Sequence, residues 1–139
     1  MGNCYNKIEI DAPVTQVWDK IKDFHDLSWA AGVIETLAKV GDKKGGEVGA
    51  QRILNDAFHE SLISIDHDSF TFGYSIDDGP GPVAKDLVKN YKGLVKLTPA
   101  GSGTLVEWSA SFDSKADSEV ADFCNPIYQA LLGAMQKAF

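Results

Sequence analysis

The sequence predicts an α+β domain in which a curved antiparallel sheet of about seven strands wraps around one long C-terminal helix. Two observations carry this prediction. Segments of strand length alternate with turns rich in Gly, Asp, Asn and Pro, and residues 116–139 repeat apolar residues at three- and four-residue spacing. The chain has 139 residues, and no linker, internal repeat or low-complexity tract divides it. Residues 1–139 are therefore expected to fold as one domain.

A strand and two short helices are expected at the N-terminus. Residues 4–10 alternate polar and apolar side chains, which is typical of a half-buried strand. Asp11 can cap a helix, and Pro13 suits its first turn, where a missing N–H costs nothing. A shorter second helix is expected over residues 25–31, ending at Gly32. The apolar stripe of the first helix consists of Val14, Val17, Trp18, Ile21 and Phe24.

Six more strands are expected before the last helix. The Asn55-Asp56 pair indicates a tight hairpin, and the glycines and prolines of residues 78–82 exclude regular structure there. Apolar side chains occur on both parities of residues 58–65, so a β-bulge would let both contribute to the core. The expected strands cover residues 33–40, 48–54, 58–65, 69–76, 87–97 and 104–112.

The C-terminal helix needs a partner for its apolar stripe. Asp113 or Ser114 can cap this helix, and Pro126 is expected to bend it or to break it one turn in. A sheet of about seven strands curls, and burying the stripe against its concave face leaves a space between sheet and helix. The stripe consists of Val120, Phe123, Cys124, Ile127, Leu131, Ala134, Met135 and Ala138.

Strand parity predicts which side chains face that space, because alternate residues of a strand point to one face. The inward sets are rich in rings, and two of them carry tyrosine hydroxyls that prefer a partner when buried. Any single ring is as well explained by core packing, but the group indicates a small-molecule pocket. The inward sets are Phe70, Phe72, Tyr74 and Ile76, then Tyr91, Gly93, Val95 and Leu97, then Val106, Trp108, Ala110 and Phe112.

One carboxylate and one guanidinium stand out beside these rings. If Glu60 points inward, burial should raise its pKa unless Arg52 or another donor pairs with it. Arg52 is the only arginine of the chain, so it is the one guanidinium that could orient a polar group there. The alternative is that both side chains lie exposed on neighbouring strands.

Composition excludes several classes of function. The chain has 20 acidic and 13 basic residues and a net charge of −7, which disfavours nucleic acid and anionic membrane surfaces. Cys4 and Cys124 form no metal-binding or redox motif and are expected to be buried, so we expect no metal and no cofactor. With no signal peptide and no apolar run near 18 residues, a cytoplasmic protein without a membrane span is expected.

Three segments of the chain together resemble one family. They are Asp11-Ala12-Pro13-Val14 leading into Val17-Trp18, Val48-Gly49-Ala50-Gln51-Arg52, and Thr104-Leu105-Val106-Glu107-Trp108-Ser109. The chain resembles the helix-grip (SRPBCC) superfamily of START lipid-transfer domains, birch-pollen allergens and bacterial polyketide cyclases/dehydrases. Gly73-Tyr74-Ser75-Ile76 and Asn90-Tyr91-Lys92 are similar to a branch of small bacterial cyclase-like proteins related to plant abscisic-acid receptors.

This resemblance implies a helix-grip fold that binds a hydrophobic or amphipathic small molecule between sheet and helix. It implies a lid at residues 78–83 with Pro80, Gly81, Pro82 and Val83. The receptor lysine that meets a hormone carboxylate corresponds to a position near Glu35, and the receptor gate and latch sequences are absent, so hormone reception is not expected. By position, the pocket residues would be Leu54, Glu60, Leu62, Tyr74, Ile76, Tyr91, Trp108, Phe123 and Ile127, with Phe72 and Arg52 added from parity and charge.

Three functions remain open. The first is a binding or carrier protein for a lipid, a polyketide or an aromatic metabolite, since no nucleophile–base motif occurs. The second is a cofactor-free cyclase, dehydratase or isomerase, with Glu60 as general acid or base and Tyr91 or Tyr74 donating to a carbonyl or enolate oxygen. The third is an accessory protein whose lid contacts a partner once ligand is bound, with a homodimer through the lid as one form.

Overall fold

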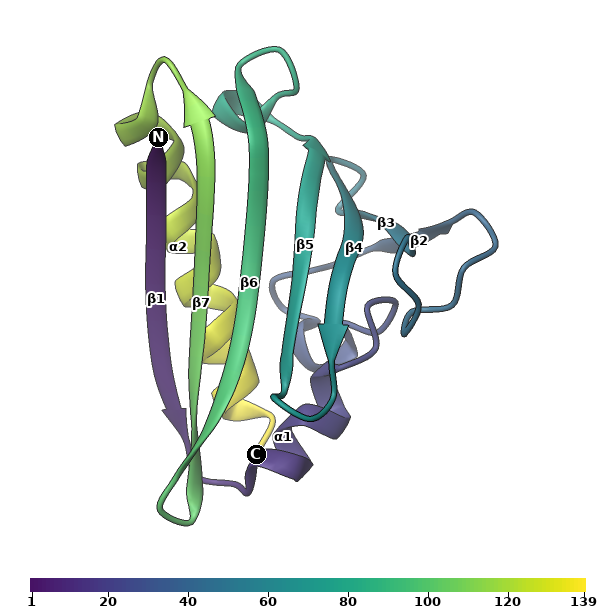
Figure 1. Cartoon of the computed structure of the whole chain (residues 1–139), viewed down its shortest axis with the longest axis vertical. Coiled ribbons are helices and arrows are strands. Elements are labelled where there is room, and N and C mark those ends of the chain that lie inside the picture. Colours follow the sequence, from purple (N-terminus) through teal and green to yellow (C-terminus); the bar gives the residue numbers. More distant parts are fainter.

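The computed structural model describes residues 1–139 and confirms the predicted fold class. A seven-stranded antiparallel sheet in the order β1-β7-β6-β5-β4-β3-β2 curves around the long helix α2 (Figure 1). Its strands are β1 (Gly2–Ile10), β2 (Leu37–Val40), β3 (Gln51–Leu54), β4 (Phe58–Asp66), β5 (Thr71–Asp78), β6 (Val88–Ala100) and β7 (Gly103–Ser114). The helical elements are α1 (Val14–Ile21), η1 (Ser28–Ala30), η2 (Gly81–Val83) and α2 (Asp117–Lys137).

The first helix is shorter than its apolar stripe predicts. Helix α1 ends at Ile21, and Phe24 lies beyond it, although its side chain is buried. The Phe24 N–H donates to the Gly45 carbonyl, 3.0 Å away, and the Asp23 side chain accepts from the His25 N–H. These bonds replace the next helical turn. Asp11 does not cap α1 either, because the cap position is Pro13 and no side chain bonds there.

The second helix and two of the strands are also shorter than the sequence predicts, again because of hydrogen bonds in the turns beside them. Only the 3₁₀ turn η1 forms within residues 25–31. The N–H groups of Val33 and Ile34 donate back to the Ala30 carbonyl, so β2 begins at Leu37 instead of residue 33. The Ala50 N–H closes a turn onto the Glu47 carbonyl, which delays the start of β3.

The fourth strand contains the kind of bulge that lets both of its parities contribute to the core. The pairing of β4 with β5 shifts register between His59 and Glu60 and again between Leu62 and Ser64. Glu60 and Leu62 share one parity and are both buried, and after the second shift Ile65, of the other parity, packs against the core. Phe70 lies just before β5 with a positive φ of 52°, in the hairpin turn and not in the strand.

Helix α2 is continuous across Pro126, so the expected break does not occur. Its cap position is Ala116, and no side chain caps the helix, so neither Asp113 nor Ser114 acts as the expected cap. The Ser114 hydroxyl, two residues earlier, accepts from the Ala116 N–H instead. The helix packs mainly along β1 and also contacts β7, which leaves the concave face of β3, β4 and β5 free to form one wall of a cavity (Figure 1). None of the helices is both long and apolar enough to cross a membrane.

Candidate functional site

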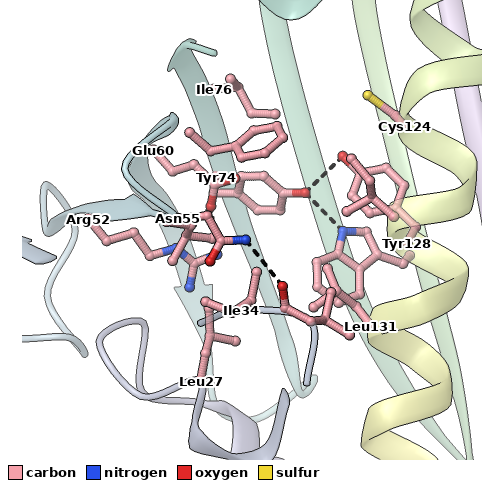
Figure 2. Close-up of a pocket in the computed structure, with 15 residues that line it drawn as sticks. Leu27, Ile34, Arg52, Asn55, Glu60, Tyr74, Ile76, Cys124, Tyr128 and Leu131 are labelled. Atoms are coloured by element: carbon pink, nitrogen blue, oxygen red, sulfur yellow. Dashed lines mark hydrogen bonds and ion pairs between the residues drawn. The ribbon is translucent and has the colours of Figure 1, made fainter. Parts of the chain in front are cut away.

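A cavity of about 130 Å³ lies between the concave face of the sheet and α2 (Figure 2). Twelve of its 15 lining residues are hydrophobic, so the cavity suits an apolar molecule. Three parts of the chain form its walls, namely strands β3, β4, β5 and β7, helix α2, and two loops. The lining residues are Arg52, Leu54, Phe58, Glu60, Tyr74, Ile76 and Trp108 from the strands, Cys124, Ile127, Tyr128 and Leu131 from α2, and Leu27, Val33, Ile34 and Asn55 from the loops.

Most of the residues predicted to bind ligand line this one cavity, namely Arg52, Leu54, Glu60, Tyr74, Ile76, Trp108 and Ile127. Four others do not. Leu62 is buried beside the cavity, and Phe72 packs against Trp18 of α1, with 6.3 Å between ring centroids. Tyr91 lies behind Tyr128 and stacks on Phe112. Phe123 is half-buried and packs against Phe58.

Several lining residues were not predicted, and Tyr128 is the most informative of them. It lies four residues after Cys124 and three before Leu131, so its spacing places it on the apolar stripe of α2. That spacing was the signal that could have found it. Leu27, Val33, Ile34 and Asn55 come from loops, and their position depends on tertiary hydrogen bonds that no periodicity reveals.

A buried ion pair forms the polar end of the cavity. Arg52 and Glu60 are directly opposite each other in the β3–β4 pairing and are only 4% and 6% exposed. Both Nε and Nη2 of Arg52 donate to Oε1 of Glu60, at 2.9 and 2.7 Å. Nη1 donates to the Phe24 carbonyl at 2.9 Å, and the guanidinium carbon lies 3.7 Å from the centre of the Phe24 ring. Arg52 and Glu60 are therefore buried together, and the alternative that both lie exposed on neighbouring strands is excluded.

Two opposing effects act on the Glu60 carboxyl. Burial raises its pKa above the ordinary value, and the positive charge and hydrogen bonds of Arg52 act in the other direction. Protonation of Glu60 would leave the guanidinium as a buried charge without a counter-ion, which is costly. The ion pair therefore persists partly because either charge left alone in the interior would be strongly destabilising.

A chain of hydrogen bonds crosses the other side of the cavity. Trp108 Nε1 donates to the Tyr74 hydroxyl at 2.9 Å, and Tyr74 donates to the Tyr128 hydroxyl at 3.0 Å (Figure 2). An indole N–H can only donate, so the Tyr74 hydroxyl accepts from Trp108 and keeps its own proton for the bond to Tyr128. Tyr128 also bonds to the Tyr91 hydroxyl. Burial raises the pKa of Tyr74, Tyr91 and Tyr128, so these hydroxyls stay neutral.

Asn55 fastens the loop that borders the cavity. Its Oδ1 accepts from the Glu35 N–H at 2.7 Å and from the Thr36 N–H at 3.3 Å, and its Nδ2 donates to the Val33 carbonyl at 3.1 Å. Figure 2 shows this last bond directed toward the loop that carries Ile34. Asn55 has a φ of 53°, a left-handed conformation that Asn adopts more readily than most residues. Because Asn55 is exposed, whereas Val33, Phe58 and Ile127 are partly exposed, the mouth of the cavity lies here.

The predicted lid, residues 78–83, does not line the cavity. Val83 is fully buried, and a Cβ built on Gly81 would lie 3.6 Å from the Phe123 ring. Phe123 in turn packs on Phe58, which does line the cavity. The segment therefore contacts the cavity wall at Phe58, directly beside Gly79 and through Phe123 beside Gly81.

Comparison with known proteins agrees with this arrangement. A family model described as polyketide cyclase / dehydrase and lipid transport matches residues 1–139. A search among proteins of curated function found no match.

Several solved structures are similar to the chain. A protein of Nitrosospira multiformis is 40% identical, with a TM-score of 0.96 over 99% of this chain and 95% of its own. The protein XoxI of Bacillus cereus is 28% identical, with a TM-score of 0.82 over 100% of this chain and 96% of its own. An uncharacterized protein of Bacillus thuringiensis is 27% identical, with a TM-score of 0.81 over 99% and 98%.

Proposed function

The chain belongs to the polyketide cyclase/dehydrase and lipid transport family, and from this premise we propose that it binds a hydrophobic or amphipathic small molecule in the cavity between the sheet and α2. The ligand would be a lipid, a polyketide or an aromatic metabolite, as the family suggests. The observation that carries the proposal is the cavity itself, which is about 130 Å³ in volume and lined mainly by apolar side chains. Predominantly apolar pockets with a few polar groups are typical of small-molecule sites.

Thermal unfolding in the presence of apolar compounds tests this proposal. A ligand at one hundred times its Kd stabilises the folded state by about 2.7 kcal/mol, which for a domain of this size raises Tm by several degrees. The variant Ile127→Phe fills the cavity and should abolish the shift. Its matched control is Ile63→Phe, because Ile63 is 40% exposed and does not line the cavity. If every compound class leaves Tm unchanged, or if Ile127→Phe responds as the wild type does, the proposal fails.

A second candidate is a cofactor-free cyclase, dehydratase or isomerase. It is favoured by one observation, which is that Glu60 and the tyrosines Tyr74 and Tyr128 line the same cavity. Glu60 would move a proton and a tyrosine hydroxyl would donate to an enolate oxygen. Tyr91 would act only through Tyr128, because Tyr91 does not line the cavity.

Deuterium exchange separates this second candidate from simple binding. Phenylacetone is an enolisable ketone with one ring, and its α-hydrogens exchange in D₂O at a rate that NMR follows. A catalyst would accelerate the exchange, and Glu60→Gln would remove the acceleration. A wild-type rate equal to that of buffer would reject the enzymatic candidate and leave the binding proposal standing.

A further inference from the structure

The volume of the cavity limits the size of its ligand. An apolar cavity of about 150 Å³ in another protein binds benzene, and the cavity here is about 130 Å³. A guest of one six-membered ring with a small substituent fits that space. A long acyl chain or a fused polycyclic molecule would not fit without movement of the walls.

Most polar groups at the cavity are already used within the chain. The Trp108 N–H and the Tyr74 hydroxyl each donate to the next tyrosine in the chain of hydrogen bonds. The amide of Asn55 both donates to and accepts from the backbone of residues 33–36. These groups close the cavity, and they leave little hydrogen-bonding capacity for a guest.

Glu60 is the exception. Arg52 engages only Oε1 of Glu60, so Oε2 has no hydrogen-bond partner in the chain. Each terminal nitrogen of the guanidinium also retains one N–H beyond the bonds described above. The polar end of the cavity therefore presents a carboxylate oxygen that can accept a hydrogen bond.

The charge at this end favours neutral guests. The positive charge of Arg52 is already balanced by Glu60, so a second carboxylate would meet the free oxygen of Glu60 without a cation of its own. No other Lys, Arg or His lines the cavity. Burying an anion there would carry a large desolvation penalty that nothing repays.

We propose that the cavity selects uncharged one-ring compounds that carry a hydrogen-bond donor, such as a phenolic hydroxyl or a primary amide, and that this donor bonds to Oε2 of Glu60. This inference rests on the proposed binding function and names the class of its ligand. Glu60 and Arg52 determine specificity, and the apolar walls supply most of the affinity.

Two pairs of compounds with nearly the same shape test the selection. Phenol and toluene differ by a donor, and benzamide and benzoate differ by a charge. Titration calorimetry at pH 7 should give a Kd for phenol at least tenfold lower than for toluene. Benzamide should bind at least tenfold more tightly than benzoate.

A charge-swap variant gives the sharpest readout. Glu60→Gln frees the Arg52 guanidinium, so benzoate should now bind more tightly than benzamide. The matched control is Glu35→Gln, which makes the same charge change on an exposed residue outside the cavity and should keep the wild-type order. If Glu60→Gln does not fold, the wild-type measurements still decide the question.

The binding results distinguish the proposed ligand selectivity from the proposed binding function. Equal binding of phenol and toluene, or of benzamide and benzoate, would overturn the inference and leave cavity binding intact. Absence of saturable binding for all four compounds would overturn the inference and count against the proposed function as well.

Discussion

At the scale of single residues, the buried pair of Arg52 and Glu60 is the feature that most needs a reason. Such a pair seldom adds net stability, because desolvation of both charges offsets their attraction. Three donors of Arg52 are nonetheless satisfied, and Phe24 covers the guanidinium. A pair that stabilises little but is held this firmly is consistent with a role in ligand selection.

Replacing one or both members of the pair separates stability from function. Arg52→Met alone leaves a buried carboxylate without a partner and should lower the free energy of unfolding by about 3–5 kcal/mol. The double variant Arg52→Met/Glu60→Leu should equal or exceed the wild type in stability, by up to about 4 kcal/mol. Urea denaturation measures both. A double variant less stable than the wild type would mean that the ion pair adds net stability to the fold.

The same pair predicts a dependence of stability on pH. Burial raises the pKa of Glu60 above its ordinary value of 4.5, so its contribution to stability is fully present below that value. That contribution is lost as pH rises through the raised pKa of the folded state. The stability advantage of Arg52→Met/Glu60→Leu over the wild type should therefore grow as pH rises from 4.5. Urea midpoints measured across this range check it, and an advantage that shrinks instead would mean that Arg52 lowers the pKa of Glu60.

At the scale of elements, the loop of residues 31–36 and the β3–β4 turn control access to the cavity. Three side-chain bonds from Asn55 and one backbone bond from the Asn55 N–H to the Thr36 carbonyl join them. Neither segment has regular structure of its own at this point. Local opening of the cavity mouth is therefore opposed mainly by these four hydrogen bonds.

Asn55→Gly removes the fastening and keeps the backbone, since glycine accepts a positive φ readily. Hydrogen exchange at the Glu35 and Thr36 amides should accelerate, and ligand association and dissociation should both become faster with little change in Kd. Asp56→Gly is the control, because Asp56 has nearly the same φ of 55° and its side chain bonds to none of the loop. Equal acceleration in both variants would assign the effect to added backbone freedom and not to the lost side chain.

Elements with strong periodicity could be predicted from the sequence, and elements held by tertiary bonds could not. Alternation identified all seven strands, because that pattern is local. It left open which parity of β4 faces inward, since the register shifts of that strand depend on its pairing with β5. The ends of α1, β2 and β3 depend on bonds such as that from Phe24 to Gly45, which join residues distant in sequence.

The same division applies to the cavity. Strand parity correctly predicted that Tyr74 and Trp108 face the cavity. It could not predict that Tyr128 lies between the Tyr91 hydroxyl and the cavity. That arrangement depends on how deeply α2 sits against the sheet.

For the whole molecule, the proposed function depends on one feature, which is that the sheet curves around α2 and encloses a cavity. The outer face of the sheet offers a comparison within the same molecule, because Ile63 and Leu94 are exposed there and lie away from the cavity. Binding at the proposed site and nonspecific binding to apolar surface therefore affect different methyl groups.

A methyl-labelled NMR titration with phenol shows whether a small guest enters this cavity. We expect saturable shifts of the methyl signals of Leu27, Ile34 and Leu131, which line the cavity, and unchanged signals for Ile63 and Leu94. Shifts confined to Ile63 and Leu94, or no saturable shift at any methyl group, would contradict this expectation.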